Sequence, residues 1–128
     1  MFLEIETGKF SVKAIVQERD NCTFFVPVMD FLKLQYATNR SNVSGLKTFF
    51  KRYAKMGRLE FTSETFHEAS KENDIWRFSK GQLRIYCFMD GDILILTHGN
   101  LKKTNKTDKA NIDKAVREKE LYFGSKIK

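Results

Sequence analysis

The amino-acid sequence predicts a small α+β domain, with an antiparallel sheet and helices gathered on one face of it. Three observations predict this class. Two segments in the first half carry apolar residues at helical spacing, three alternating segments follow them, and one more helical stripe comes last. A chain of 128 residues is long enough for one hydrophobic core. We therefore expect a single domain over residues 1–128.

Two strands should open the chain, at residues 2 to 6 and 10 to 17, around a turn at Gly8-Lys9. The second alternates apolar side chains from Phe10 to Val16, which is typical of a half-buried strand. We expect residues 19 to 24 to form a loop.

Two helices should follow. Pro27 suits the first position of a helix, where its missing N–H is not needed, and residues 39 to 41 should end this element. The second helix is expected from about Asn42 to Met56, with one apolar stripe and with Gly57 as its C-terminal cap. Together they predict a helical hairpin packed on one face of the sheet. The sequence gives no clear assignment for residues 58 to 73.

Three strands are predicted next, in the segments IWRFS, QLRIYCFM and DILILTH. Lys80-Gly81 and Asp90-Gly91 are expected to be the two-residue turns between them. This register places Arg77 opposite Arg84, and Arg84 opposite Thr97. A helix capped by Thr107 should then end the fold.

Alternation of side chains along a strand divides these three strands into two faces. Arg77, Arg84, Tyr86 and Thr97 share the first face. The second is nearly all apolar and should cover the helices; it holds Trp76, Phe78, Leu83, Ile85, Cys87, Leu94, Leu96 and His98.

The net charge of +7 suggests an acidic partner: a nucleic acid, an anionic membrane or an acidic protein. A protein that is basic without such a partner is an equally good interpretation of the charge alone. The distribution is more informative, because residues 99 to 128 hold nine Lys or Arg against four Asp or Glu.

Several function classes find no support in the sequence. No apolar run approaches the ~20 residues of a membrane span, and the N-terminal segment MFLEIETGK does not resemble a signal peptide. Two cysteines fit a reducing cytoplasm, so we expect a cytoplasmic protein. The few His and Cys residues lie far apart and predict no metal site, and no phosphate loop or nucleophile elbow suggests a cofactor or a serine nucleophile.

The arginines are the candidate binding residues. Two like charges directly opposite each other destabilise a sheet, whereas a phosphate between two guanidinium groups would stabilise the pair. Lys102 and Lys103 follow the third strand and could reach the same face. The alternative is that each arginine pairs with a carboxylate, such as Glu68 or Glu72.

His98 stands at the end of a strand. Its parity places it in the core, as a structural histidine. A bulge at His98-Gly99 would instead turn it toward the arginines, where it could transfer a proton.

Five motifs in this order resemble the C-terminal half of HigB-type toxins of the RelE/ParE superfamily. They are Trp76-Arg77-Phe78, Arg84-Ile85-Tyr86, His98-Gly99, Lys102-Lys103-Thr104 and Lys106-Thr107. The resemblance covers roughly residues 11 to 123, so residues 1 to 8 are expected to be an N-terminal extension. Two positions depart from the family pattern: Asn100 stands where Phe is usual, and Asp108 where Pro is usual.

The resemblance implies a RelE-like fold and a toxin neutralised by a co-encoded antitoxin, often a helix-turn-helix protein. Such toxins cleave mRNA in the ribosomal A site without a metal ion. The superfamily also includes gyrase poisons and inactive copies, so a non-catalytic binder of the same fold is the alternative.

The resemblance and the chemistry of RNA cleavage suggest roles for individual residues. Arg84 would stabilise the charge on the phosphorane, assisted by Arg77. Lys102 or Lys103 would transfer a proton or bind phosphate, and Tyr86 would orient the ribose or stack on a base. Lys106 and Lys109 are expected to bind the RNA backbone, and His98 is a further RNA-binding candidate.

Overall fold

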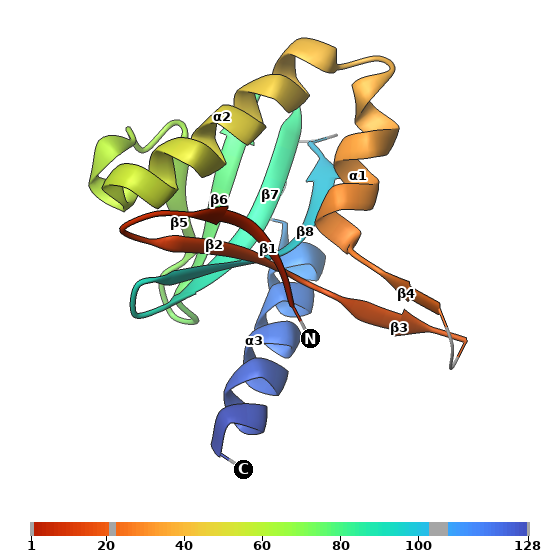
Figure 1. Cartoon of the computed structure of the whole chain (residues 1–128), viewed down its shortest axis with the longest axis vertical. Coiled ribbons are helices and arrows are strands. Elements are labelled where there is room, and N and C mark those ends of the chain that lie inside the picture. The colour runs from red at the N-terminus through yellow and green to blue at the C-terminus, as the bar shows by residue number, and fades with distance from the viewer. Residues whose placement is uncertain (1, 21–22, 103–107, 128) are drawn as a thin grey trace.

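A computed structural model describes residues 2–20, 23–102 and 108–127, the last three of them by their backbone alone. It shows an α+β fold in which a mixed sheet of six strands has helices on both faces (Figure 1). The elements are β1 (Phe2–Thr7), β2 (Ser11–Ile15), β3 (Gln17–Arg19), β4 (Thr23–Phe25), α1 (Pro27–Tyr36), α2 (Arg40–Met56), the short 3₁₀ helix η1 (Arg58–Glu60), β5 (Phe66–Ser70), β6 (Ile75–Lys80), β7 (Leu83–Asp90), β8 (Ile93–Leu101) and α3 (Lys109–Ile127).

The strands lie in the order β1-β2-β8-β7-β6-β5. The α+β class is confirmed, but the prediction of a purely antiparallel sheet is wrong, because β2 and β8 run parallel. The hairpin turns of a sequence fix only the relative direction of strands that follow one another. The connection from β2 back to the sheet is long and passes through two helices, so it leaves either direction open.

Two segments became strands that the sequence did not predict. Residues 19 to 24 were expected to be a loop, but β3 and β4 pair across them, with Gln17 opposite Phe25. This small hairpin projects beside α1 (Figure 1). β5 lies within the unassigned stretch 58 to 73 and forms one edge of the six-stranded sheet. Beyond β6, the sheet therefore extends by one strand that the sequence did not predict.

The hydrophobic core between the sheet and the helical hairpin matches the prediction. α1 and α2 bury Val28, Leu32, Val43, Leu46 and Phe50 against the predicted apolar face of β6, β7 and β8. Gly57 ends α2 with a positive φ of 76°, and its N–H donates to the carbonyl of Tyr53, as expected of a C-terminal cap.

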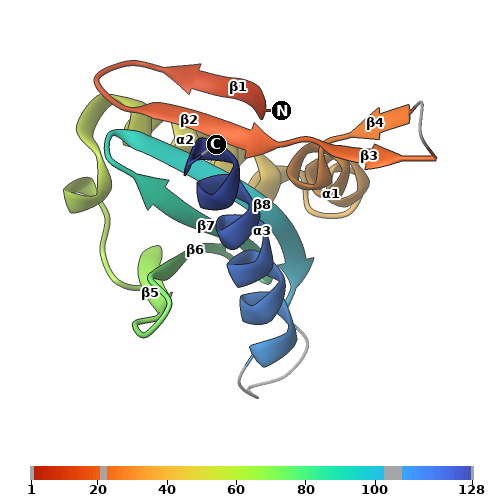
Figure 2. The same ribbon diagram turned by 90° about the horizontal axis from the view of Figure 1, so that it is seen from below.

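The last helix packs on the other face, so the prediction that all helices gather on one face is wrong. Ala115 of α3 lies in a second core with Ile75, Phe88 and Ile95. Figure 2 shows α3 in front of the sheet and α2 behind it. All residues from Leu83 to Phe88 in β7 are buried, and a strand buried on both faces needs cover on both. The expected N-cap, Thr107, lies outside the described residues.

The two hairpins turn one residue later than predicted. Lys80 pairs with Leu83 and Asp90 with Ile93, so Gly81 and Gly91 are the first central residues of their turns. Their φ values of 57° and 58° explain the choice, because these tight hairpin turns need a positive φ at that position and glycine adopts it without strain. Arg77 is therefore not opposite Arg84. The shift changes each pairing between β6 and β7 by two residues and leaves Arg77, Arg84 and Tyr86 on one face.

Candidate functional site

A row of four side chains crosses the sheet on the face that carries α3. His67 of β5 pairs with Arg77 of β6, Arg77 pairs with Tyr86 of β7, and Tyr86 pairs with His98 of β8. Directly paired residues project from the same face and lie side by side. We call these four residues the cross-sheet row.

His98 joins this row because β8 contains a bulge. The pairing shifts between Tyr86 and Cys87, so that Thr97 is the extra residue between Leu96 and His98. The parity prediction, which placed His98 in the core on the side of the helical hairpin, is therefore wrong. The alternative of a bulge that turns His98 toward the arginines describes its position, although the bulge lies one residue earlier.

Arg84 stands in the neighbouring row, opposite Ser79 and Asn100. Only 8% of the residue is exposed. One of its terminal nitrogens, Nη1, donates to the carbonyl oxygens of Gly81 at 2.8 Å and Leu83 at 2.9 Å. These bonds fix the guanidinium group at the hairpin turn.

Neither Arg77 nor Arg84 forms an ion pair with a carboxylate of the residues that the structure describes. Glu68 pairs with Trp76 and so projects to the other face. Within the same residues, Nε of each arginine and Oδ1 of Asn100 are buried without a hydrogen-bond partner. The alternative that the arginines are neutralised by Glu68 or Glu72 is thus wrong for the described structure.

The electrostatics are those of a cationic site with little compensation. Burial lowers the pKa of Arg77 and of Arg84, and the charge of Arg77 lowers the pKa of Arg84 further. Asp108, which directly precedes α3, acts on both arginines in the opposite direction. A bound anion would do the same more strongly, because it would lie closer to both.

Tyr86 is fully buried within the row. Its hydroxyl donates a hydrogen bond to the carboxylate of Asp108, and the guanidinium carbon of Arg77 lies 5.9 Å from the centre of its ring. The Tyr86 ring is thus one wall of the site, and its hydroxyl is already engaged.

His98 is held at both ring nitrogens. Nε2 lies 2.9 Å from Oδ1 of Asn111, and Nδ1 lies 2.9 Å from Oγ1 of Thr97. Because an amide oxygen only accepts, Nε2 is assigned the proton. Burial lowers the pKa of His98 to about 4, so the ring is neutral at pH 7. His98 therefore connects β8 to the first turn of α3 and is not free to transfer a proton.

The predicted lysines lie at the margins of the site or outside the described residues. Lys102 is exposed just after β8, and its backbone N–H donates to the carbonyl of Gln82. Lys109 is exposed at the first position of α3. Lys103 and Lys106 lie outside the described residues. Of the predicted site residues, the structure thus brings together Arg77, Arg84, Tyr86 and His98.

Sequence reasoning missed His67, Asp108 and Asn111 as members of the site. Arg77 donates from Nη2 to Nε2 of His67 across 3.0 Å, and Asn111 donates to Asp108 across 2.6 Å. A signal for His67 was available, because the segment FHEA alternates before IWRFS and could have been drawn as a further hairpin strand. That pairing would have put His67 next to Arg77.

The described residues contain no group of three or more His, Cys, Asp or Glu side chains that could hold a metal ion. Among the described helices, none is long and apolar enough to cross a membrane.

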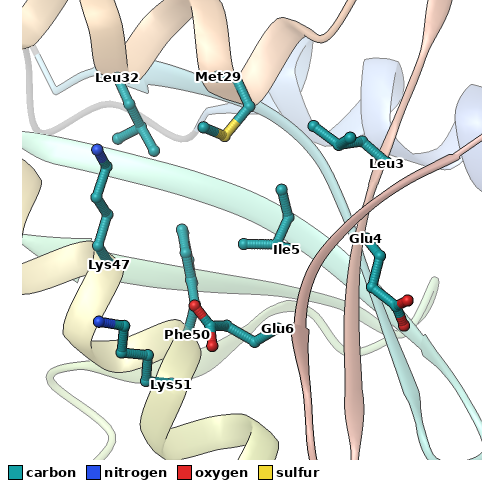
Figure 3. A pocket seen from close by; sticks show the side chains of 9 residues that line it. All are labelled: Leu3, Glu4, Ile5, Glu6, Met29, Leu32, Lys47, Phe50 and Lys51. Carbon is teal, nitrogen blue, oxygen red and sulfur yellow. The ribbon is translucent and has the colours of Figure 1, made fainter.

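A cavity of about 330 Å³ lies on the opposite side of the sheet from the arginines (Figure 3). Its lining combines apolar side chains with two acidic and two basic ones, and consists of Leu3, Glu4, Ile5, Glu6, Met29, Leu32, Lys47, Phe50 and Lys51. Because β1, α1 and α2 form this cavity, it is separate from the cross-sheet row.

Residues 66–120 match a protein family described as phage derived protein Gp49-like (DUF891). It is a RelE/toxin-like family of the toxin–antitoxin type. The matched residues run from the first residue of β5 into α3 and include the whole cross-sheet row and Arg84. A search of curated proteins found no match to the chain.

Proposed function

We propose that this chain is the toxin of a type II toxin–antitoxin pair, with a HigB-like domain of RelE type that cleaves mRNA on the ribosome without a metal ion. The domain would comprise residues 1–128, with residues 1 to 8 as an extension of it. The match of residues 66–120 to a toxin–antitoxin family supports the toxin assignment, and the site supports the chemistry.

The observation that carries this proposal is the pair of arginines on one face with no carboxylate partner among the described residues. Burying cations costs free energy unless an anion compensates them. An RNA phosphate offers oxygens that match guanidinium N–H groups, and the net charge of +7 draws polyanions to the surface.

RNA supplies its own nucleophile, the 2′-hydroxyl next to each phosphate. Arg84 would stabilise the charge that develops on the phosphorane, and Arg77 would assist it. Lys102 or Lys103 would bind phosphate or transfer a proton, while Lys106 and Lys109 would hold the RNA backbone. Tyr86 would orient the ribose or stack on a base, which requires the start of α3 to move, because Tyr86 is fully buried and its hydroxyl donates to Asp108.

The partner would be a co-encoded antitoxin, of the helix-turn-helix type, that covers the arginines or displaces α3. The other partners would be mRNA and the ribosome, with no membrane and no small-molecule cofactor. Co-expression with the neighbouring gene tests this part. Restored growth and a co-purifying complex are expected, and failure of both contradicts it.

The decisive experiment is to induce this chain alone and map RNA 5′ ends. New ends within translated mRNA are expected. Arg84→Ala should slow cleavage of ribosome-bound mRNA by roughly a hundredfold or more, whereas Lys109→Ala should mainly weaken binding and its salt dependence. Both variants are assayed with and without a chelator, with ribosome integrity checked. Normal cleavage by Arg84→Ala would show that this site assignment is wrong.

A second candidate is a non-catalytic binder of the same fold, such as a gyrase poison or an inactive RNA-binding module. Its support is that Tyr86 and His98 are buried and hydrogen-bonded, as in a structural network. DNA-damage markers without RNA cuts would favour the gyrase poison, and RNA binding without cuts the inactive module.

A further inference from the structure

His67 lies at the open end of the cross-sheet row. It lies on β5, the edge strand of the sheet, and its side chain is half-buried. Among the described residues, its side chain has one hydrogen-bond contact, the 3.0 Å bond between its Nε2 and Nη2 of Arg77. An RNA strand lying on the two arginines would pass beside this ring.

Other groups of the row are less suited to proton transfer. His98 is 3% exposed, and both of its ring nitrogens have partners. The hydroxyl of Tyr86, which is fully buried, donates to Asp108. His67 is thus the imidazole that a substrate can reach from solvent.

We propose that His67 is the general base of this site and takes the proton of the attacking 2′-hydroxyl group. This inference rests on the proposed function, that the chain cleaves RNA. It goes beyond it by assigning proton abstraction to a residue of β5 in place of a lysine after β8.

The hydrogen bond with Arg77 determines which ring nitrogen of His67 carries the proton. An arginine N–H only donates, so Nε2 of His67 must accept, and the proton of the neutral ring sits on Nδ1. The lone pair of Nε2 therefore points at the guanidinium group that would bind the phosphate. When a phosphate takes over that N–H of Arg77, Nε2 is left without a donor beside the ribose of the same nucleotide.

Burial and the nearby cations keep the imidazole of His67 neutral, which is the form that can accept a proton. Burial, then Arg77 and then Arg84 lower its pKa, so the ring is neutral at pH 7. The cations that face His67 are Arg77 of β6 and Arg84 of β7. Asp108 is the carboxylate whose charge acts on both of these arginines. A phosphate bound between the two arginines adds negative charge. This charge raises the proton affinity of Nε2 of His67, the atom that takes the proton.

The cleavage reaction needs no reactant other than the RNA and water. His67 Nε2 takes the 2′-hydroxyl proton, and the 2′-oxygen forms a bond to phosphorus while Arg84 stabilises the added charge. The bond from phosphorus to the 5′-oxygen breaks, and this oxygen takes a proton from solvent. The products are a 2′,3′-cyclic phosphate and a 5′-hydroxyl end, and the imidazolium returns its proton to solvent.

The test measures cleavage of ribosome-bound mRNA by the full chain between pH 5 and 9. It compares the native protein with His67→Gln, His67→Ala and Glu68→Gln, the last being a matched control whose side chain is next along β5 and projects to the other face. Thermal unfolding and RNA affinity establish that each variant is folded and binds. His67→Asn replaces any variant that does not fold.

General-base catalysis is worth roughly 10²- to 10⁴-fold, so His67→Gln should cleave at least a hundredfold more slowly, with RNA affinity within threefold of the native value. The native rate should rise with pH and then level off, and His67→Gln should lose that rise. Added imidazole should restore part of the activity of His67→Ala, and Glu68→Gln should behave as the native chain.

A His67→Gln rate within threefold of native, or an unchanged pH profile, overturns the assignment to His67. Absence of cleavage by the native chain overturns the proposed function as well.

Discussion

The ring of Tyr86 stacks on the ring of His98, with their centres 5.0 Å apart and their planes inclined by 12°. Both residues also hold the start of α3, Tyr86 through Asp108 and His98 through Asn111. The beginning of the last helix is therefore attached to the row of residues that contains Arg77. A change at either contact should alter the stability of the fold, and a change at Asp108 should also alter the charge of the site.

The first prediction concerns His98 and pH. Its pKa of about 4 in the folded protein lies below the ordinary value of 6.5, so the unfolded chain binds the proton more readily. The stability from this residue is complete above pH 6.5 and is lost as the pH falls toward 4, by up to about 3 kcal/mol. His98→Gln should be less stable than the native chain at pH 7.5, and this difference should shrink toward pH 4. Urea unfolding at several pH values measures it, and a difference independent of pH contradicts the prediction.

Asp108→Asn should tighten binding of RNA. The side-chain oxygen of asparagine can still accept the Tyr86 hydroxyl, while the negative charge that acts on Arg77 and Arg84 is removed. We expect a gain of about 1 kcal/mol in binding at low salt, which fades as salt increases. Fluorescence anisotropy with a short RNA checks this. Asp113→Asn, an exposed change on the same helix, is the control, and an equal gain in both variants would show that only net charge matters.

Anions should stabilise the fold through the two arginines. Sulfate or phosphate at ten times its dissociation constant should add about 1.4 kcal/mol, or a few degrees in Tm. The double variant Arg77→Gln, Arg84→Gln should not respond beyond the effect of sodium chloride at equal ionic strength. Arg52→Gln removes an arginine that is ion-paired with Glu60 elsewhere and should respond as the native chain does. A full response in the double variant would place the anion site elsewhere.

Three glycines should differ in their tolerance of alanine. At Gly99, a Cβ atom would lie 2.4 Å from the ring of Phe31 and 2.8 Å from Ile85, so Gly99→Ala should cost about 1–3 kcal/mol by overpacking. Gly91→Ala meets no atom within 4 Å but must adopt a φ of 58°, which should cost about 1 kcal/mol. Gly124→Ala, in open space on α3, should stabilise the fold by up to about 1 kcal/mol. Chemical unfolding ranks the three, and a different order contradicts this account.

The sequence predicted the candidate site in part. It placed Arg77, Arg84 and Tyr86 on one face, because alternation along a strand is a local property and survives a shift of two in the pairing. It could not predict that His98 joins them, since a bulge at Thr97 reverses the parity of β8. It gave His67 no role, because the strand that carries it was not assigned.

For this protein, the sequence by itself determined the elements whose signals are local. These are the two helices, with their apolar stripes and the Gly57 cap, the existence of the β6–β8 hairpins, and the faces of their strands as far as the bulge in β8. Only the tertiary structure decided three matters that depend on residues far apart in the chain. They are the parallel pairing of β2 with β8, the packing of α3 on the second face, and the side-by-side placement of His67, Arg77, Tyr86 and His98. The physical reason is that periodicity and turn chemistry act over a few residues, whereas burial of both faces of β7 is satisfied only when distant segments pack together.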